Sequence, residues 1–171
     1  MAEDMGFSAA ALIVTSQLVF EPAFRQCCED NSCGMYQKCY TCPPYCGSPE
    51  DMKSQILAHK WAFVLQTMWD ISDIEDWHLY SKHERQHDAM VRSFIRQLPN
   101  EYSGGFMTAA GGCSLCEICA LLEQKPCRFP ELKAFSISAY CIHVQKLTDM
   151  LGWDYNLGAD CVAYLGLYVF D

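Results

Sequence analysis

The clearest structural signal in the sequence is the stretch WAFVLQTM at residues 61–68. It is apolar except for one Gln and one Thr, and its length is typical of a strand buried on both faces. A similar run, VAYLGLYVF at residues 162–170, predicts a closing buried strand, and residues 106–110 predict a short strand that leads into Gly111 and Gly112. These runs predict a central sheet.

Helix signals alternate with the predicted strands. Ser48 followed by Pro49 and two acidic residues predicts a short helix that continues to about Lys60. A capping box at residues 72–75 and apolar residues at three- and four-residue steps predict a long amphipathic helix that stops before Pro99. Residues 136 to about 151 predict another helix, ended by Gly152. The alternation predicts an α/β fold, with residues 1–171 forming a small single domain whose central mixed sheet is flanked by helices.

Charge and hydropathy narrow the class of protein. The 171 residues include 12 Lys and Arg against 21 Asp and Glu, for a formal charge of −9. This sign argues against a nonspecific binder of nucleic acid or of anionic membranes. The early apolar stretch Ala9–Val14 is much shorter than the ~20 residues of a membrane span, and no Lys or Arg precedes it. We therefore expect a cytoplasmic protein that neither binds nucleic acid nor inserts into a membrane.

The sequence holds 12 cysteines, most of them in two blocks. In a reducing cytosol, clustered cysteines more often bind metal or perform redox chemistry than form disulfides. The second block has the spacing C-x2-C-x2-C-x7-C, and its members are Cys113, Cys116, Cys119 and Cys127. Three thiols at three-residue intervals favour a cubane iron–sulfur cluster, whereas zinc sites more often use two separated C-x2-C pairs. Ser114 and Glu117 also match a capping box, which predicts one or two helical turns here.

The first block offers six thiols, more than a tetrahedral site for one metal ion can use. They are Cys27, Cys28, Cys33, Cys39, Cys42 and Cys46. The spacing leaves several ligand sets open: Cys28, Cys33, Cys39 and Cys42, or a set in which Cys27 or Cys46 replaces one of these. A cluster held by three thiolates, with one iron open to substrate, is a further alternative.

The sequence resembles a family of small, cysteine-rich prokaryotic proteins described only as predicted metal-binding proteins. Five stretches carry the resemblance: residues 28–36 (CEDNSCGMY), 39–44 (CYTCPP), 111–119 (GGCSLCEIC), 126–131 (PCRFPE) and 136–144 (SISAYCIHV). The resemblance implies two ligand sets, one of Cys28, Cys33, Cys39 and Cys42 and one of Cys113, Cys116, Cys119 and Cys127. Cys27, Cys46 and Cys141 stand where the family pattern has other residues.

The remaining candidate residues are interpreted as structural. His87 falls on the apolar face of the long helix and is expected in the core, while Lys82, Glu84, Arg85, Asp88 and Arg92 are expected on its solvated face. Cys161 is expected to begin a buried strand. No nucleotide-binding fingerprint is present.

The leading hypothesis is an iron–sulfur protein with two [4Fe-4S] clusters, which carries electrons or feeds them into a larger enzyme through a redox partner protein. One alternative is an enzyme with an open iron, in which Cys46 or Cys27 could be a reactive thiol. The other is a protein with structural zinc.

Overall fold

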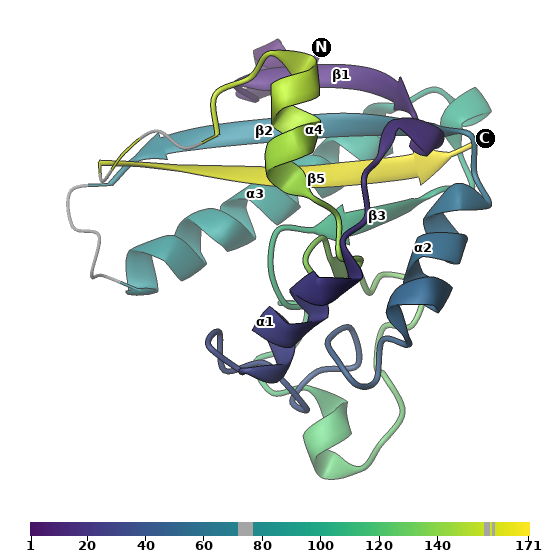
Figure 1. The fold of residues 1–171 in the computed structure, drawn as a ribbon, viewed down its shortest axis with the longest axis vertical. Coiled ribbons are helices and arrows are strands. Elements are labelled where there is room, and N and C mark those ends of the chain that lie inside the picture. The colour runs from purple at the N-terminus through teal and green to yellow at the C-terminus, as the bar shows by residue number, and fades with distance from the viewer. Residues whose placement is uncertain (72–76, 156–157, 159) are drawn as a thin grey trace.

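Five strands form the central sheet of the computed structural model, in the order β1-β2-β5-β3-β4 (Figure 1). The strands are β1 (Ala9–Val14), β2 (Trp61–Asp70), β3 (Phe106–Ala109), β4 (Phe135–Ser136) and β5 (Cys161–Phe170). Neighbouring strands run antiparallel, except that β3 and β4 are parallel. The structure describes residues 1–71, 77–155, 158 and 160–171. The predicted mixed sheet and the α/β fold are confirmed.

The two long apolar runs form the middle of the sheet. Strand β2 pairs with β5 over its whole length, from Trp61 opposite Phe170 to Asp70 opposite Cys161. Successive residues of β2 contribute to opposite faces, so Val64 and Leu65 belong to different core clusters. Strand β1 was not predicted. Its sequence shows no alternation of polar and apolar residues, although its burial does alternate, with Leu12 about half exposed at 51% and Ile13 buried.

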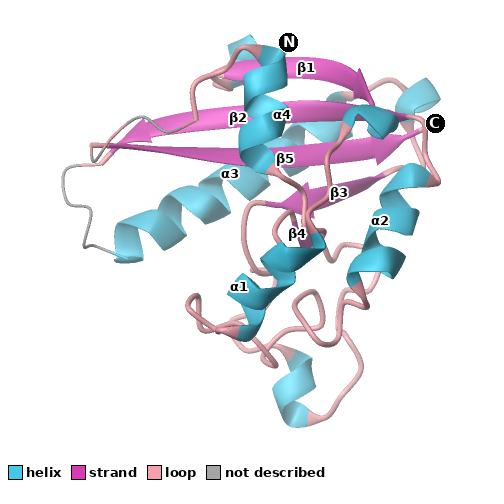
Figure 2. Cartoon of the chain, viewed as in Figure 1, coloured by secondary structure: helices cyan, strands magenta, loops and turns pink. Residues whose placement is uncertain are grey.

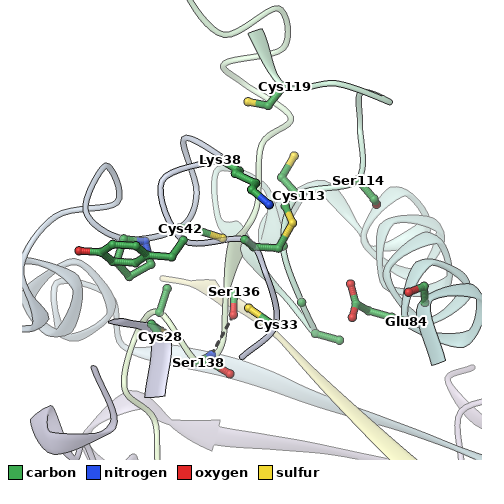
Figure 3. Close-up of a pocket in the computed structure, with 18 of the residues that line it drawn as sticks. Cys28, Cys33, Lys38, Cys42, Glu84, Cys113, Ser114, Cys119, Ser136 and Ser138 are labelled. Carbon is green, nitrogen blue, oxygen red and sulfur yellow. Dashed lines mark hydrogen bonds between the residues drawn. The ribbon is translucent and has the colours of Figure 1, made fainter. Parts of the chain in front are cut away.

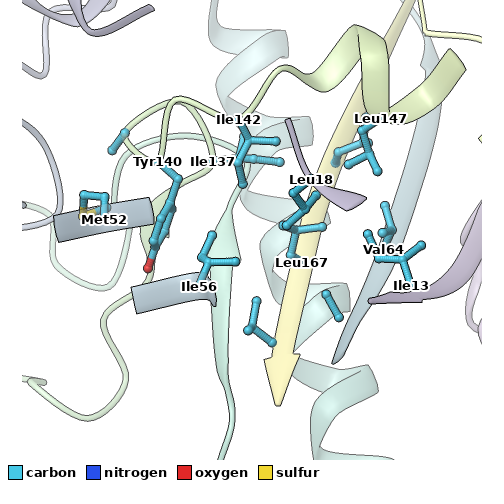
Figure 4. Packing of buried hydrophobic residues seen from close by; sticks show 14 residues of the cluster. Ile13, Leu18, Met52, Ile56, Val64, Ile137, Tyr140, Ile142, Leu147 and Leu167 are labelled. Atoms are coloured by element: carbon cyan, nitrogen blue, oxygen red, sulfur yellow. The ribbon is translucent and has the colours of Figure 1, made fainter. Parts of the chain in front are cut away.

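Helices cover both faces of the sheet (Figure 1). They are α1 (Arg25–Glu29), α2 (Pro49–Leu57), α3 (Trp77–Gln97) and α4 (Val144–Leu151). Helix α3 packs against one face, where Val91 and Phe94 join Leu65. On the other face α2 and α4 contribute Ile56 and Leu147 to the larger cluster, drawn in Figure 4.

Two predicted helices form as expected. Helix α2 begins after Ser48, whose hydroxyl accepts a hydrogen bond from the Asp51 amide, and it ends three residues before Lys60. Helix α3 ends at Gln97, before Pro99. The predicted capping box at residues 72–75 lies outside the described residues.

The predicted helix over residues 136–151 is wrong in its first half, because α4 begins only at Val144. Ser136 lies in strand β4, and the Ile137 amide donates to the Ala109 carbonyl. Cys141 adopts a left-handed conformation with φ of 56°, which a helix cannot continue through. The predicted end is correct, since Gly152 takes the left-handed C-cap conformation with φ of 69°.

Apart from Cys27 and Cys28, which lie in α1, the residues of both cysteine blocks lie in loops and turns beyond the β3 side of the sheet (Figure 2). The second block lies in the crossover between the parallel strands β3 and β4, at residues 110–134. The helix predicted from Ser114 does not form there, and a short 3-10 helix occupies Ala120–Glu123 instead. The first block runs from α1 to the start of α2. The order of the sheet thereby brings together two segments that are about 70 residues apart in the chain.

Candidate metal centre

A cavity of about 820 Å³ lies between the two cysteine blocks. Six of the eight predicted ligands line it, three from each block: Cys28, Cys33, Cys42, Cys113, Cys116 and Cys119. Helix α3 forms part of another wall, where the Glu84 carboxylate faces the cysteines (Figure 3). The volume is within the range of roughly 300–1,000 Å³ that is usual for sites that hold a small molecule or cofactor.

A second, much smaller pocket borders this cavity. Cys39 and Cys127, the two predicted ligands that do not line the large cavity, line the small pocket together with Cys113, Cys116 and Cys119. The structure therefore brings all eight predicted ligands to one region of the molecule. The two blocks do not form separate regions, because three cysteines border both spaces.

The blocks meet at the Cys39 thiol. It interacts with the thiols of Cys113 and Cys42, and the Thr41 hydroxyl lies 3.1 Å from its Sγ. Hydrogen bonds from these groups to a Cys39 thiolate, first of all that from Cys113, hold the pKa of Cys39 well below its usual range. The same bonds, together with burial, raise the pKa of Cys42 and of Cys113. One thiolate is thus stabilised at the junction of the two blocks.

The thiols are spread around the cavity and do not converge on one point. In the described part of the chain, no three His, Cys, Asp or Glu side chains form a site for a single metal ion. The donor set nevertheless suits a metal centre, because thiolates are the ligands that iron–sulfur clusters and zinc use in proteins.

The other four cysteines lie in different surroundings. Cys27 is exposed and Cys141 is buried. Cys46 is half-buried, and its Sγ accepts a hydrogen bond of 3.5 Å from the Arg25 guanidinium. Neither Cys27 nor Cys46 is among the described residues that line either space. Cys161 begins β5 as predicted, but it is half-buried there.

Arg25 connects the first block to the segment after β4. Its side chain is 9% exposed and donates hydrogen bonds to the Gly47 carbonyl at 3.0 Å and to the Ala139 carbonyl at 2.8 Å. The sequence analysis missed this residue, because nothing in its neighbourhood distinguishes a buried arginine from a surface one.

The predicted solvated face of α3 is wrong for Asp88 and Glu84. Asp88 is 4% exposed, and its Oδ1 accepts a hydrogen bond of 2.9 Å from the Ala110 amide at the end of β3. Burial raises the pKa of Asp88 to about 7, and burial also raises the pKa of Glu84. The sequence of the helix does not reveal the burial of Asp88 and Glu84. The crossover covers these two acidic residues on a face that also carries basic residues, so the charge pattern is that of a solvated face. The prediction for His87 is confirmed, because His87 is fully buried in the core.

Gly111 allows Glu84 to approach the cysteine crossover. A Cβ atom at Gly111 would fall 2.2 Å from the Glu84 carboxyl carbon, a distance that requires the carboxylate to move. We expect a Gly111→Ala variant to be less stable than the wild type by about 1 kcal/mol, the low end of the cost of overpacking, because the obstructing atoms end a flexible side chain that borders the cavity. Urea denaturation measures this difference. The double variant Gly111→Ala, Glu84→Ala removes the obstructing carboxylate and should recover most of the loss, and an additive effect would contradict the contact.

The fold and the site describe a cysteine-rich protein of the mixed α/β class, with a thiol-lined cavity at the edge of its sheet. The chain belongs to the family described as "Predicted metal-binding protein (DUF2284)", whose sequence model matches residues 11–170. The comparison with curated proteins found no match, and neither did the comparison with solved structures. Among the described residues, no helix has both the length and the apolar character needed to cross a membrane.

Proposed function

We propose that this protein binds two [4Fe-4S] clusters through eight cysteines and transfers electrons. The proposed ligands are Cys28, Cys33, Cys39, Cys42, Cys113, Cys116, Cys119 and Cys127. The observation that carries the proposal is that all eight border two adjoining spaces between the blocks. The clusters would supply one-electron redox chemistry there, and the two chain segments would hold them and limit the access of water.

The spread of the thiols supports clusters over a single zinc ion. Four sulfurs at about 2.3 Å from one zinc ion lie within about 4 Å of one another, whereas a cluster takes each cysteine on a different iron. A cavity with thiols on several walls offers the second arrangement. Structural zinc remains the competing outcome of the metal analysis.

Metal and sulfide analysis tests the proposal. Protein purified without oxygen should contain about eight iron and eight acid-labile sulfide per chain, and the reduced protein should give the EPR signal of [4Fe-4S]⁺ clusters. Stoichiometric zinc without acid-labile sulfide would overturn it.

Electron transfer requires a partner, and we propose that a cytoplasmic redox protein docks on the crossover between β3 and β4. Four of the ten large apolar side chains that are most exposed in the described residues lie on this segment: Ile118, Leu122, Phe129 and Leu132. Residues 118–133 carry three basic side chains against two acidic ones, so the acidic excess of the chain lies elsewhere. An apolar, nearly neutral surface beside the ligands suits a small, transient interface.

A Leu132→Asp variant should weaken this docking. Leu132 is 56% exposed, so the change should leave folding intact, while burying a charge in the interface should slow electron transfer to the native partner several-fold. Stopped-flow oxidation of the reduced protein by its partner measures the rate. Leu12→Asp is the matched control, because Leu12 is 51% exposed on β1, and an equal loss in both variants would exclude the docking surface.

The size and lining of the cavity favour one second candidate, an enzyme with an open iron. Besides the thiols, the walls carry Lys38, Glu84 and Ser136, which could hold a polar substrate (Figure 3). Alanine variants of the six first-block cysteines distinguish the two functions. If four of the single variants abolish the same cluster signal, that cluster has no open iron.

A further inference from the structure

Arg128 directly follows the proposed ligand Cys127, and the crossover itself holds its side chain in place. Its Nη1 donates a hydrogen bond of 2.8 Å to the Ile118 carbonyl, and its Nη2 donates one of 2.9 Å to the Glu123 carboxylate. These bonds use two different nitrogens of a planar group whose donors have a rigid arrangement. The guanidinium therefore has a defined orientation, although the side chain is 40% exposed.

In this orientation the guanidinium contacts a proposed ligand. It interacts with the thiol of Cys116, and both residues line the small pocket. The pKa of Arg128 lies above its usual value, first because of the hydrogen bond with Cys116 and then because of the charge of Glu123. Cys116 also lines the large cavity. One sulfur thus borders both the guanidinium and the space that has room for a cluster.

The charges around this contact do not cancel. The Glu123 carboxylate pairs with Arg128 and also with the Lys125 ammonium, at 3.1 Å. One negative charge offsets only one of the two cations, so the group of three side chains carries a net positive charge. A net positive group therefore contacts Cys116, although the chain as a whole has a formal charge of −9.

A cationic donor beside a ligand sulfur stabilises the reduced form of a cluster. Reduction adds a negative charge to iron that thiolates already surround, and both net charge and hydrogen bonds to the sulfurs help to set the reduction potential. A guanidinium keeps its charge in proteins, and hydrogen bonds from charged donors are about twice as strong as neutral ones. We propose that Arg128 donates a hydrogen bond to the Cys116 ligand and thereby raises the reduction potential of the cluster that Cys116 binds. This inference rests on the proposed function.

The position of Arg128 connects this effect with the proposed docking surface. Arg128 precedes Phe129 in the segment 118–133, and its bond to the Ile118 carbonyl joins it to a second residue of that surface. A partner that docks there would exclude water from the exposed part of the guanidinium, and electrostatic interactions become stronger when water is removed. The cluster that Arg128 tunes would therefore be the one beside the docked partner.

Redox titrations followed by EPR test the inference without an activity assay. In Arg128→Gln the potential of one cluster should fall relative to the wild type, because the positive charge is lost, and that of the other cluster should not change. Arg128→Lys keeps the charge but not the paired geometry, so a smaller fall is expected. Arg96→Gln, at the exposed end of α3, is the matched control and should shift neither potential. An unchanged potential in Arg128→Gln, or equal shifts in both Gln variants, would overturn the inference.

A Cys116→Ser variant identifies the cluster concerned. A serine oxygen can keep the iron bound while altering the EPR signal of its own cluster, and if that cluster is lost, the missing signal identifies it. The same signal should shift in Arg128→Gln, and a shift confined to the other signal would contradict the inference. If Arg128→Gln binds less iron, Arg128→Lys decides, and a potential equal to that of the wild type would count against the proposal. Wild-type protein without iron and sulfide would instead refute the proposed function.

Discussion

An Arg25→Ala variant is expected to lose about 2–5 kcal/mol of folding free energy together with the ordered arrangement of the first cysteine block. The guanidinium is buried and donates to the carbonyls of Gly47 and Ala139. The buried Ala139 carbonyl left without a donor costs about 1–3 kcal/mol, and the part-buried Gly47 carbonyl adds a smaller cost. Gly47 directly follows the block and Ala139 lines the large cavity, so the loss should also reduce the iron content.

The matched control is Arg92→Ala. Arg92 also donates to a carbonyl, that of Leu132 at 2.8 Å, but this bond is exposed to solvent. Water can replace the lost donor there, so the cost should stay below about 1 kcal/mol. Urea denaturation and iron analysis of both variants measure the difference, and equal losses would show that Arg25 does not hold the block in place.

Much of the fold was predictable because its strongest signals are local. Strands β2 and β5 are long apolar runs, and α2 has a capping residue and a proline at its start. Strand β1 and the segment from Ser136 to His143 were not predictable in this way. Their backbones are fixed by partners distant in sequence: Ala11 lies opposite Val64, Phe20 forms a bridge with Ile142, and Ile137 bonds to Ala109.

The cysteine spacing selected eight residues that the fold brings to one region, but it did not show that the two blocks meet. Spacing describes how one segment can wrap around a metal centre, and it contains no information on which segments meet. The meeting of the blocks depends on the parallel pairing of β3 with β4 and on the position of α1, which are properties of the whole fold. Arg25, Glu84 and Asp88 were missed for the same reason, since their burial follows from contacts with remote loops.

The neighbouring side chains His87 and Asp88 are expected to oppose each other in the pH dependence of stability. Burial lowers the pKa of His87 from 6.5 to about 3, while burial raises that of Asp88 from 3.8 to about 7. Between about pH 4 and 6.5 the unfolded chain binds a proton at His87 that the folded chain lacks, so this group makes stability rise with pH. Over the same range the folded chain binds a proton at Asp88 that the unfolded chain lacks, so Asp88 makes stability fall with pH. Each slope is about 1.4 kcal/mol per pH unit, and the two cancel.

Removing either group should expose the other slope. Asp88→Asn keeps an oxygen acceptor for the Ala110 amide, and its stability should rise by about 3 kcal/mol between pH 4.5 and 6.5 relative to the wild type. In the His87→Gln variant, stability should fall by a similar amount over the same pH range relative to the wild type, because nothing then opposes the proton equilibrium of Asp88. Urea denaturation at intervals of half a pH unit measures these curves, and all other titrating groups are common to the three proteins. The double variant should regain the wild-type slope, because both opposing proton equilibria are then absent. If the stability curve of either single variant runs parallel to that of the wild type, the prediction is wrong.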